Sequence, residues 1–327
     1  MTQKYCKYLN NGLNIHQFGL KYCNNIWFDR ASWGYDKNSL EEFWKTREEV
    51  FKKLKNGIAP ENCEKCMYLQ EIDDNEIISD KIKFIEIYNW IQCNCACFYC
   101  SNREQTKLKI FNRRNQKGVI DALPLLKNLQ KKGKLDADLE IFMAGGEPTI
   151  LKEFVGLLKF FIKNNYRAHV LSNGILYEKY ISKLINTQNH SSLSISLDCG
   201  TRETFKKIKG VDKFDDVIKN IKKYVTDTKE LSDRIMLKYI LLKGVNDNKE
   251  EIDKWIDVCS SIGVVSYVPS IEFCHSVMNP EKSELTPEIC ELYEYIKKRV
   301  KEVNPDFNVY TYDFVEEIIK RNSYNIR

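Results

Sequence analysis

From about residue 83 onward, short apolar segments alternate with amphipathic segments, and this alternation constrains the fold more than any other feature. The apolar segments read as strands, and the amphipathic ones repeat their apolar residues every three or four positions, as helices do. Near-continuous apolar strands between helices predict an α/β fold with a parallel sheet. Six strands suit an incomplete barrel, so the sequence predicts a partial (β/α)6 TIM-like barrel. The expected strands are 84–88, 139–143, 167–171, 193–197, 235–241 and 264–269, and the expected helices are 117–132, 151–164, 177–186, 201–209, 214–227, 249–262 and 287–303.

Four cysteines follow the first expected strand in the segment Cys93-Asn94-Cys95-Ala96-Cys97-Phe98-Tyr99-Cys100. Cys93, Cys97 and Cys100 fit the spacing C-x3-C-x2-C, with Tyr99 before the last one. A loop after a strand can wrap three thiolates around one corner of an iron–sulfur cube. The fourth iron is then open to a small molecule. Cys95 does not fit the spacing, and we interpret it as a bystander thiol.

The chain of 327 residues contains twelve cysteines, and its first residues include no apolar signal region. Because no apolar run approaches membrane-spanning length, we expect a cytoplasmic protein without a membrane partner. In a reducing compartment, clustered cysteines bind metal more often than they form disulfides. The net charge of +5 is spread over interleaved acidic and basic residues, which argues against a nucleic-acid partner.

The first 80 residues carry four further cysteines: Cys6, Cys23, Cys63 and Cys66. Cys63-Glu64-Lys65-Cys66 is a C-x2-C pair, which lets two thiolates hold one metal from a tight turn. The pattern predicts an amphipathic helix over 40–54 and a short hairpin from 14–18 and 21–28. Four cysteines are enough for a zinc site or for a fully ligated iron–sulfur cluster, and both interpretations stay open.

Small polar residues lie at the ends of the next expected strands, where parallel α/β folds gather their chemistry. Ala144-Gly145-Gly146-Glu147-Pro148 follows the second strand; its glycines let a ligand approach the backbone, and Glu147 adds an acceptor. Ser172 follows the third strand, and Ser196 and Asp198 lie at the end of the fourth. Hydroxyl and carboxylate groups there suit a ribose, and they are equally ordinary as helix caps.

Taken in order, these motifs resemble those of radical S-adenosylmethionine (SAM) enzymes over roughly residues 83–275. The C-x3-C-x2-C loop is similar to their cluster loop, and Gly145-Gly146-Glu147-Pro148 is similar to their methionine-binding motif. The resemblance implies that a flavodoxin- or ferredoxin-type donor reduces the cluster, and that a 5′-deoxyadenosyl radical then removes hydrogen from a substrate carbon. The implied contacts are a [4Fe-4S] cluster on Cys93, Cys97 and Cys100, the methionine end of SAM on Gly145, Gly146 and Glu147, its ribose on Ser172, Ser196 and Asp198, and its adenine near Tyr99.

Residues 1–80 resemble the auxiliary-cluster module called twitch, which is related to the SPASM domain. Pro60-x-x-Cys63-x-x-Cys66 matches the last part of that module, and Cys6 and Cys23 match in spacing. The aromatic-proline sequence usual after the first cysteine is absent, so Cys6 is the weakest match. The resemblance implies a second [4Fe-4S] cluster, a core over 81–275 and a helical cap over 276–327. Because the module occupies the first 80 residues, we expect no separate leader-binding domain.

Two more cysteines bear on the outcome of the reaction. Epimerases of this class quench the substrate radical with a cysteine thiol, and Cys199 and Cys274 lie near strand ends from which they can reach a barrel mouth. We therefore predict epimerisation or oxidation of a saccharide, small metabolite or peptide, with Cys274 and Cys199 as candidate hydrogen donors. A peptide-modifying cross-linking maturase is one alternative. A non-catalytic zinc or iron–sulfur protein is the other.

Overall fold

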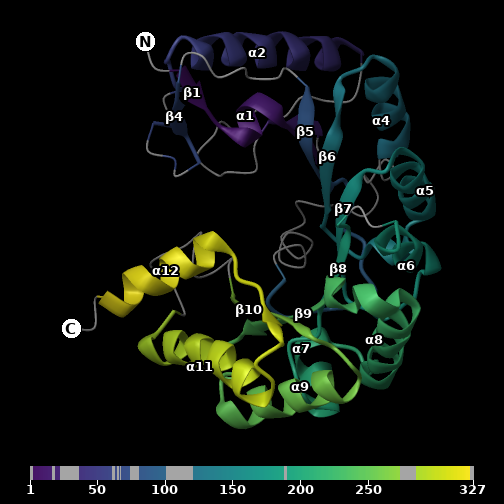
Figure 1. Ribbon diagram of the computed structural model, residues 1–327, viewed down its shortest axis with the longest axis vertical. Coiled ribbons are helices and arrows are strands. Elements are labelled where there is room, and N and C mark those ends of the chain that lie inside the picture. Colours follow the sequence, from purple (N-terminus) through teal and green to yellow (C-terminus); the bar gives the residue numbers. More distant parts are fainter. Residues whose placement is uncertain are drawn as a thin grey trace. The chain divides into compact units, whose positions relative to one another are not determined.

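A computed structural model describes residues 3–16, 19–22, 37–60, 63, 64, 66, 68–73, 81–100, 121–187, 190–272 and 285–324. The chain divides into two compact units (Figure 1). The first unit comprises residues 1–91, 117–148 and 152–169, and the second comprises residues 92–116, 149–151 and 170–327.

The first unit is organised around a parallel strand, β5. Its strands are β1 (Gln3–Tyr5), β2 (Gly12–His16), β3 (Gly19–Lys21), β4 (Gln70–Ile72), β5 (Ile82–Tyr88) and β6 (Leu135–Met143). Strands β2 and β6 both pair with β5 in parallel, and β3 pairs with β2 in antiparallel. Strands β1 and β4 form a separate antiparallel pair. Ile85 and Ile87, at alternate positions of β5, are fully buried, as one face of a covered sheet requires.

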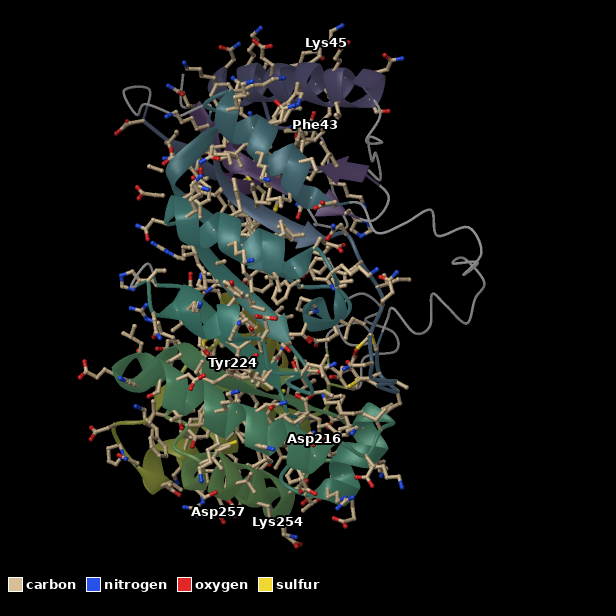
Figure 2. All side chains as sticks on the ribbon, turned by 90° about the vertical axis from the view of Figure 1, so that its right-hand side faces the viewer. Phe43, Lys45, Asp216, Tyr224, Lys254 and Asp257 are labelled. Atoms are coloured by element: carbon tan, nitrogen blue, oxygen red, sulfur yellow. The ribbon has the colours of Figure 1, made fainter. Side chains whose placement is uncertain are left out.

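Amphipathic helices complete the first unit: α1 (Lys7–Asn11), α2 (Lys37–Lys55), α4 (Ala122–Lys131) and α5 (Phe154–Asn164). In α2 the side chain of Phe43 is fully buried and that of Lys45 is exposed, and Figure 2 shows them on opposite sides of the helix. Helix α4 follows Asp121, whose carboxylate accepts a hydrogen bond of 2.9 Å from the amide of Leu123. This is the cap that the first turn of a helix needs.

The second unit holds a parallel run of strands. Strand β7 (Arg167–Ser172) begins in the first unit and ends in the second, and it is followed by β8 (Ser192–Ser196), β9 (Ile235–Leu241), β10 (Ser266–Ile271) and β11 (Asn308–Val309). Their order in the sheet is β7-β8-β9-β10-β11, and β8 to β11 pair in parallel. The helices of this unit are α6 (Lys179–Ile185), α7 (Arg202–Lys209), α8 (Phe214–Thr228), α9 (Lys249–Ser261), α11 (Pro287–Val303) and α12 (Asp313–Tyr324).

The two faces of strands β8 to β10 differ in what covers them. Tyr239 of β9 and Tyr267 of β10 contact Trp255 of α9, with ring centroids 4.9 Å and 5.4 Å apart. We call this side the helix face and the opposite side the inner face. Figure 1 shows α11 and α12 near β10, and α11 packs against both β10 and α12.

The predicted α/β class with parallel strands is confirmed. Each of the six expected strands is present as β5 to β10, within a few residues of the expected bounds. A hairpin is present as β2 and β3, which begin two residues before the expected 14–18 and 21–28, and residues 23–28 lie outside the described residues. The expected helix over 40–54 is α2, and that over 287–303 is α11. Strands β5 to β10 do not close into a barrel within the described residues, as an incomplete barrel requires. The division into 1–80, 81–275 and 276–327 stays a prediction.

None of the helices in the described ranges is both long enough and apolar enough to cross a membrane.

Candidate functional site

The cysteine loop is attached to the C-terminal end of helix α7. The amide of Ala96 donates a hydrogen bond of 2.8 Å to the carbonyl of Lys209, and the amide of Phe98 donates one of 3.2 Å to the carbonyl of Ile208. The last carbonyls of a helix have no partner inside it, so α7 has acceptors available for the loop. Gly210 follows with φ of 69°, and a Cβ there would lie 2.9 Å from the carbonyl oxygen of Ala96. Only glycine combines this conformation with so close a contact.

A buried ion pair also contacts this loop, through the side chain of Tyr99. Asp198 follows strand β8 with φ of 62°, and its Oδ2 accepts hydrogen bonds from Lys209 Nζ and, at 3.1 Å, from the hydroxyl of Tyr99. Its Oδ1 accepts a hydrogen bond of 2.9 Å from the amide of Ile240. We call Tyr99, Asp198 and Lys209 the Asp198 network. Since Asp198 and Lys209 are both buried, neither charge is tolerable without the other.

The protonation states of the network follow from its surroundings. Burial alone would lower the pKa of Lys209, but the carboxylate of Asp198 and neighbouring Tyr99 outweigh it and raise that pKa well above its usual value. Burial also raises the pKa of Tyr99, so its hydroxyl keeps its proton and donates to Asp198. The network therefore consists of one cation, one anion and one neutral donor.

The thiols of the loop differ in acidity. The pKa of Cys97 is lowered to about 7, because a hydrogen bond from Cys95 and the charge of Lys209 together exceed the effect of burial. The pKa of Cys95 is raised, since its thiol is hydrogen-bonded to Cys93 and Cys97. Asn173 Nδ2 lies 3.6 Å from the sulfur of Cys93 and donates a hydrogen bond of 2.6 Å to the side chain of Asn94. Asn173 could not be identified as a residue of this site from the sequence, because a contact with a loop about eighty positions earlier leaves no local signal.

The donor chemistry of this loop fits an iron–sulfur cluster. Thiolate is the form of cysteine that ligates metal, and Cys97 reaches it near neutral pH. Amide and backbone N–H groups beside Cys93, from Asn173 and Cys95, are the kind of donors that tune cluster sulfurs. Within the described ranges, no three Cys, His, Asp or Glu side chains are yet arranged to hold a metal ion. The residue types fit, and the thiols would have to converge around the cluster.

The glycine loop after β6 belongs to the first unit and is anchored there by Trp90. The amide of Gly146 donates a hydrogen bond of 3.1 Å to the carbonyl of Trp90. Gly145 has φ of 119°, and a Cβ there would lie 2.7 Å from that same carbonyl oxygen. Glu147 is 1% exposed. Trp90 Nε1 is buried and has no hydrogen-bond partner within the described residues. The close approach in this structure is to Trp90, and the contacts of Gly145, Gly146 and Glu147 with the methionine end of SAM stay a prediction.

The three candidate ribose contacts occupy different environments. Ser172 is buried, and its Oγ accepts a hydrogen bond of 3.0 Å from the amide of Gly174, which closes a turn. Ser196 is partly buried at the end of β8, opposite Lys238 of β9 in the register. Asp198 is fully buried, and both of its carboxylate oxygens have protein partners in the network above. The ribose role of all three stays a prediction.

The candidate hydrogen donors are Cys199 and Cys274. Cys199 is fully buried, its thiol donates a hydrogen bond of 3.3 Å to the carbonyl of Leu197, and burial raises its pKa well above the usual value. The thiol lies close enough to Cys259 of α9 to raise the pKa of that cysteine, which places it on the helix face. Cys274 lies outside the described residues. The donor role of both stays a prediction.

Three of the four N-terminal cysteines lie near one another in the first unit, and Cys23 lies outside the described residues. The amide of Cys66 donates a hydrogen bond of 3.0 Å to the carbonyl of Cys63, as a tight C-x2-C turn requires. Burial, followed by the neighbouring Cys6 and Cys66 thiols, raises the pKa of Cys63 to about 11. The charges of these three side chains therefore influence one another.

Fold and loop together define an α/β protein with a thiol-bearing loop directly after a parallel strand. The family model of the radical SAM superfamily matches residues 91–256, which is half of the chain. The protein belongs to the radical SAM superfamily. Membership of this family implies a [4Fe-4S] cluster and SAM as cofactors.

Curated relatives share this region at moderate identity. A protein of Saccharolobus islandicus (strain Y.N.15.51) named "Probable GTP 3′,8-cyclase" is 27% identical over 208 residues, which is 63% of this chain and 62% of the relative. A protein of the same name from Pyrococcus horikoshii is 27% identical over 158 residues, or 48% of this chain and 46% of the relative. The chain thus spans less than two thirds of these relatives.

Solved structures share the fold. SuiB of Streptococcus suis bound to SAM superposes with a TM-score of 0.54 at 18% identity, covering 85% of this chain and 57% of SuiB. SuiB bound to the precursor peptide SuiA gives a TM-score of 0.51 at 17% identity, covering 95% of this chain and 73% of SuiB. At these identities the likeness establishes the fold alone.

Proposed function

We propose that this protein cleaves SAM reductively at a [4Fe-4S] cluster held by Cys93, Cys97 and Cys100 and uses the product radical to remove hydrogen from a substrate carbon. The observation that carries this proposal is the anchored cysteine loop. Its backbone is held by the carbonyls of α7 and its Tyr99 by Asp198, while Cys97 is ready to act as a thiolate. Three ligands and one open iron are what SAM binding requires.

The chain's own residues would position and shield the reacting groups. When bound, the cluster and SAM supply a 5′-deoxyadenosyl radical, which no side-chain acid or base can replace. Cys93, Cys97 and Cys100 would ligate iron, and Gly145 and Gly146 would bring the backbone close to the methionine end of SAM. The Asp198 network would fix the loop, because a reacting group displaced by about 1 Å loses much of its rate.

We further propose that Cys6, Cys23, Cys63 and Cys66 hold a second, auxiliary cluster in a twitch-like module. The mutual influence of Cys6, Cys63 and Cys66 supports this arrangement. A cluster with four protein ligands has no open iron. It would therefore carry electrons rather than bind substrate.

The substrate class is proposed more broadly as a saccharide, a small metabolite or a peptide, with epimerisation or oxidation as the outcome. The names of the curated relatives add a purine nucleotide to the small metabolites. The peptide bound to SuiB keeps peptide modification, including cross-linking, as the second candidate. In each case an external flavodoxin- or ferredoxin-type reductant would supply the electron, and we propose a cytoplasmic setting for it.

Anaerobic reconstitution tests this function. The protein should bind about four irons per cluster, so about eight with both clusters, and should form 5′-deoxyadenosine from SAM under dithionite. Cys97→Ala should lose one cluster and 5′-deoxyadenosine formation together. Cys95→Ala is the matched control in the same loop: it removes the hydrogen bond to Cys97 but no proposed ligand, so it should keep both. A protein that holds zinc and forms no 5′-deoxyadenosine would instead be a structural metalloprotein.

A further inference from the structure

Asn10 of helix α1 is fully buried and lies beside Cys6, one of the cysteines of the first unit. The amide of Asn10 donates a hydrogen bond of 2.8 Å to the carbonyl of Cys6. In return, its side-chain Oδ1 accepts a hydrogen bond of 2.8 Å from the amide of Cys6. The carbonyl of Asn10 accepts a hydrogen bond from Nη2 of Arg47, which lies on α2. These contacts fix both the backbone and the side chain of Asn10 next to this cysteine.

The other polar atom of this side chain, Nδ2, has no hydrogen-bond partner within the described residues, although it is buried. The orientation of the side-chain amide follows from its neighbour: the N–H of Cys6 needs an acceptor, so Oδ1 faces Cys6 and the remaining atom is the donor. Buried amide donors are normally paired, because folding removes the water that would otherwise accept from them. An unpaired donor here therefore points to an acceptor that arrives with a ligand.

The proposed second cluster would supply such an acceptor. Cys6 and Cys63 are buried, and Cys6 and Cys66 lie close enough to Cys63 to influence its pKa. Because Nδ2 and Oδ1 of Asn10 share one carbon atom, Nδ2 also lies beside Cys6. Thiolates that ligate iron and the sulfides of a cluster are anionic sulfur atoms, and both accept hydrogen bonds. The unpaired donor and the three thiols thus belong to the same buried part of the first unit.

We propose that Asn10 Nδ2 donates a hydrogen bond to an anionic sulfur of the auxiliary cluster and thereby raises the reduction potential of that cluster. Reduction by one electron adds negative charge to the sulfur atoms, so a donor stabilises the reduced form more than the oxidised form. Burial strengthens this effect, because water does not compete for the sulfur. Asn10 ligates no iron and acts only through the sulfur atoms. The inference rests on the second cluster of the proposed function and deepens it, since it names a residue that sets how tightly this cluster holds an electron.

A redox titration of the reconstituted holoenzyme, followed by electron paramagnetic resonance, tests this inference. SAM should change the signal of the cluster with an open iron, so the signal that SAM leaves unchanged belongs to the auxiliary cluster. Asn10→Leu removes the donor and should lower the equilibrium constant for reduction of the auxiliary cluster about ten-fold, which is about 59 mV for one electron. Asn11→Leu is the matched control and should leave the potential unchanged. Asn11 is the next residue and is also buried, but its Nδ2 already donates a hydrogen bond of 2.7 Å to the carbonyl of Lys81.

A second variant separates the donor from its effect on folding. Asn10→Asp keeps an oxygen for the amide of Cys6 but offers no N–H to the sulfur, so the potential should fall at least as far as in Asn10→Leu. The wild type gives a measurement that depends on no variant. Asparagine labelled with a nitrogen isotope in its side chain should show magnetic coupling of that nitrogen to the unpaired electron of the reduced auxiliary cluster.

The outcomes distinguish this inference from the proposed function. An auxiliary cluster without such a nitrogen coupling, or with the same potential in the wild type and Asn10→Leu, would overturn this inference alone. Equal shifts of the potential in Asn10→Leu and Asn11→Leu would overturn it too, because the change would then be structural. A protein with about four irons and no second signal would reject the auxiliary cluster of the proposed function, and this inference with it.

Discussion

Two lysines of the second unit, Lys209 and Lys238, lie near the carboxylate of Asp198, but their pKa values are shifted in opposite directions. Lys209 pairs with Asp198, is 1% exposed and has a raised pKa. Lys238 is partly buried, has a lowered pKa and meets no anion in the described part of the chain. The charge of Lys209 is neutralised by Asp198, and this ion pair supports the cysteine loop. The charge of Lys238 has no such ion pair within the described residues.

The largest effect is expected from breaking the complete pair. Lys209→Met leaves Asp198 buried without a countercharge, which should cost about 3–5 kcal/mol in the free energy of unfolding. Anaerobic urea unfolding would measure this, and iron content should fall with it. Lys238→Met is the paired comparison and should change stability by less than about 1 kcal/mol, because it removes a charge that lacks a partner. Equal losses in the two variants would mean that Lys238 is also structural.

A partly buried imidazole in the first unit, that of His16, extends the comparison to pH. Burial, followed by the charge of Lys21, lowers the pKa of His16 from 6.5 to about 4. Between these values the unfolded chain binds a proton that the folded chain does not, so stability should rise with pH from about 4 to about 6.5. It should fall by up to about 3 kcal/mol as pH drops through that window.

His16→Gln should flatten this pH dependence, as followed by unfolding at a series of pH values. If His16→Gln kept the full slope between pH 4 and 6.5, other groups would be responsible.

The contact between α7 and the cysteine loop allows a closely matched test. Gly210→Ala introduces a Cβ at φ of 69° and 2.9 Å from Ala96, and it should cost about 2–3 kcal/mol and lower cluster occupancy. Gly244→Ala has a similar φ of 71° but meets nothing within 4 Å, so it should cost only about 1 kcal/mol of backbone strain. Iron analysis and thermal unfolding would separate them. The same iron loss in both variants would refute a specific role for the α7 contact.

The smallest effect is expected at the hydroxyl of Ser194 in β8. Ser194→Ala removes a buried oxygen that has no partner in the described residues. The free energy of unfolding should therefore change by less than about 1 kcal/mol or increase slightly. Thermal unfolding without ligand would show this. A clear loss of stability would mean that the hydroxyl is already paired within the protein.

Much of the fold could be predicted because its signals are local. The apolar segment 235–241 coincides with β9. The helix expected over 249–262 is α9, Lys249–Ser261. The side chain of Asn248 caps this helix by accepting a hydrogen bond of 2.9 Å from the amide of Glu251. Strand formation and helix caps depend on residues that are close in the sequence. The pairing of strands depends on distant residues: the parallel pairing of β2 with β5 joins segments about seventy residues apart.

The candidate site also has a part that the sequence predicts and a part that it does not. The spacing of Cys93, Cys97 and Cys100 could be recognised, because three ligands on one loop form a short-range pattern. For Asp198 the sequence suggested a ribose contact, which stays a prediction, but it did not show that the carboxylate oxygens accept hydrogen bonds from Tyr99, Lys209 and Ile240. These three partners lie on three separate segments of the chain, and no pattern in the sequence relates them to Asp198. The hydrogen bonds that Asn173 donates to the loop and the close approach of Gly210 to Ala96 could not be predicted for the same reason.

By itself, the sequence determined the α/β class, the order of strands and helices, and the thiol spacing that identifies the superfamily. Each of these depends on residues that are close along the chain. Only the tertiary structure decided which lysine is neutralised by Asp198 and which is not. The physical reason is that a carboxylate has two oxygens to share, and which donors reach them is set by the packing of β8, β9 and α7 rather than by composition.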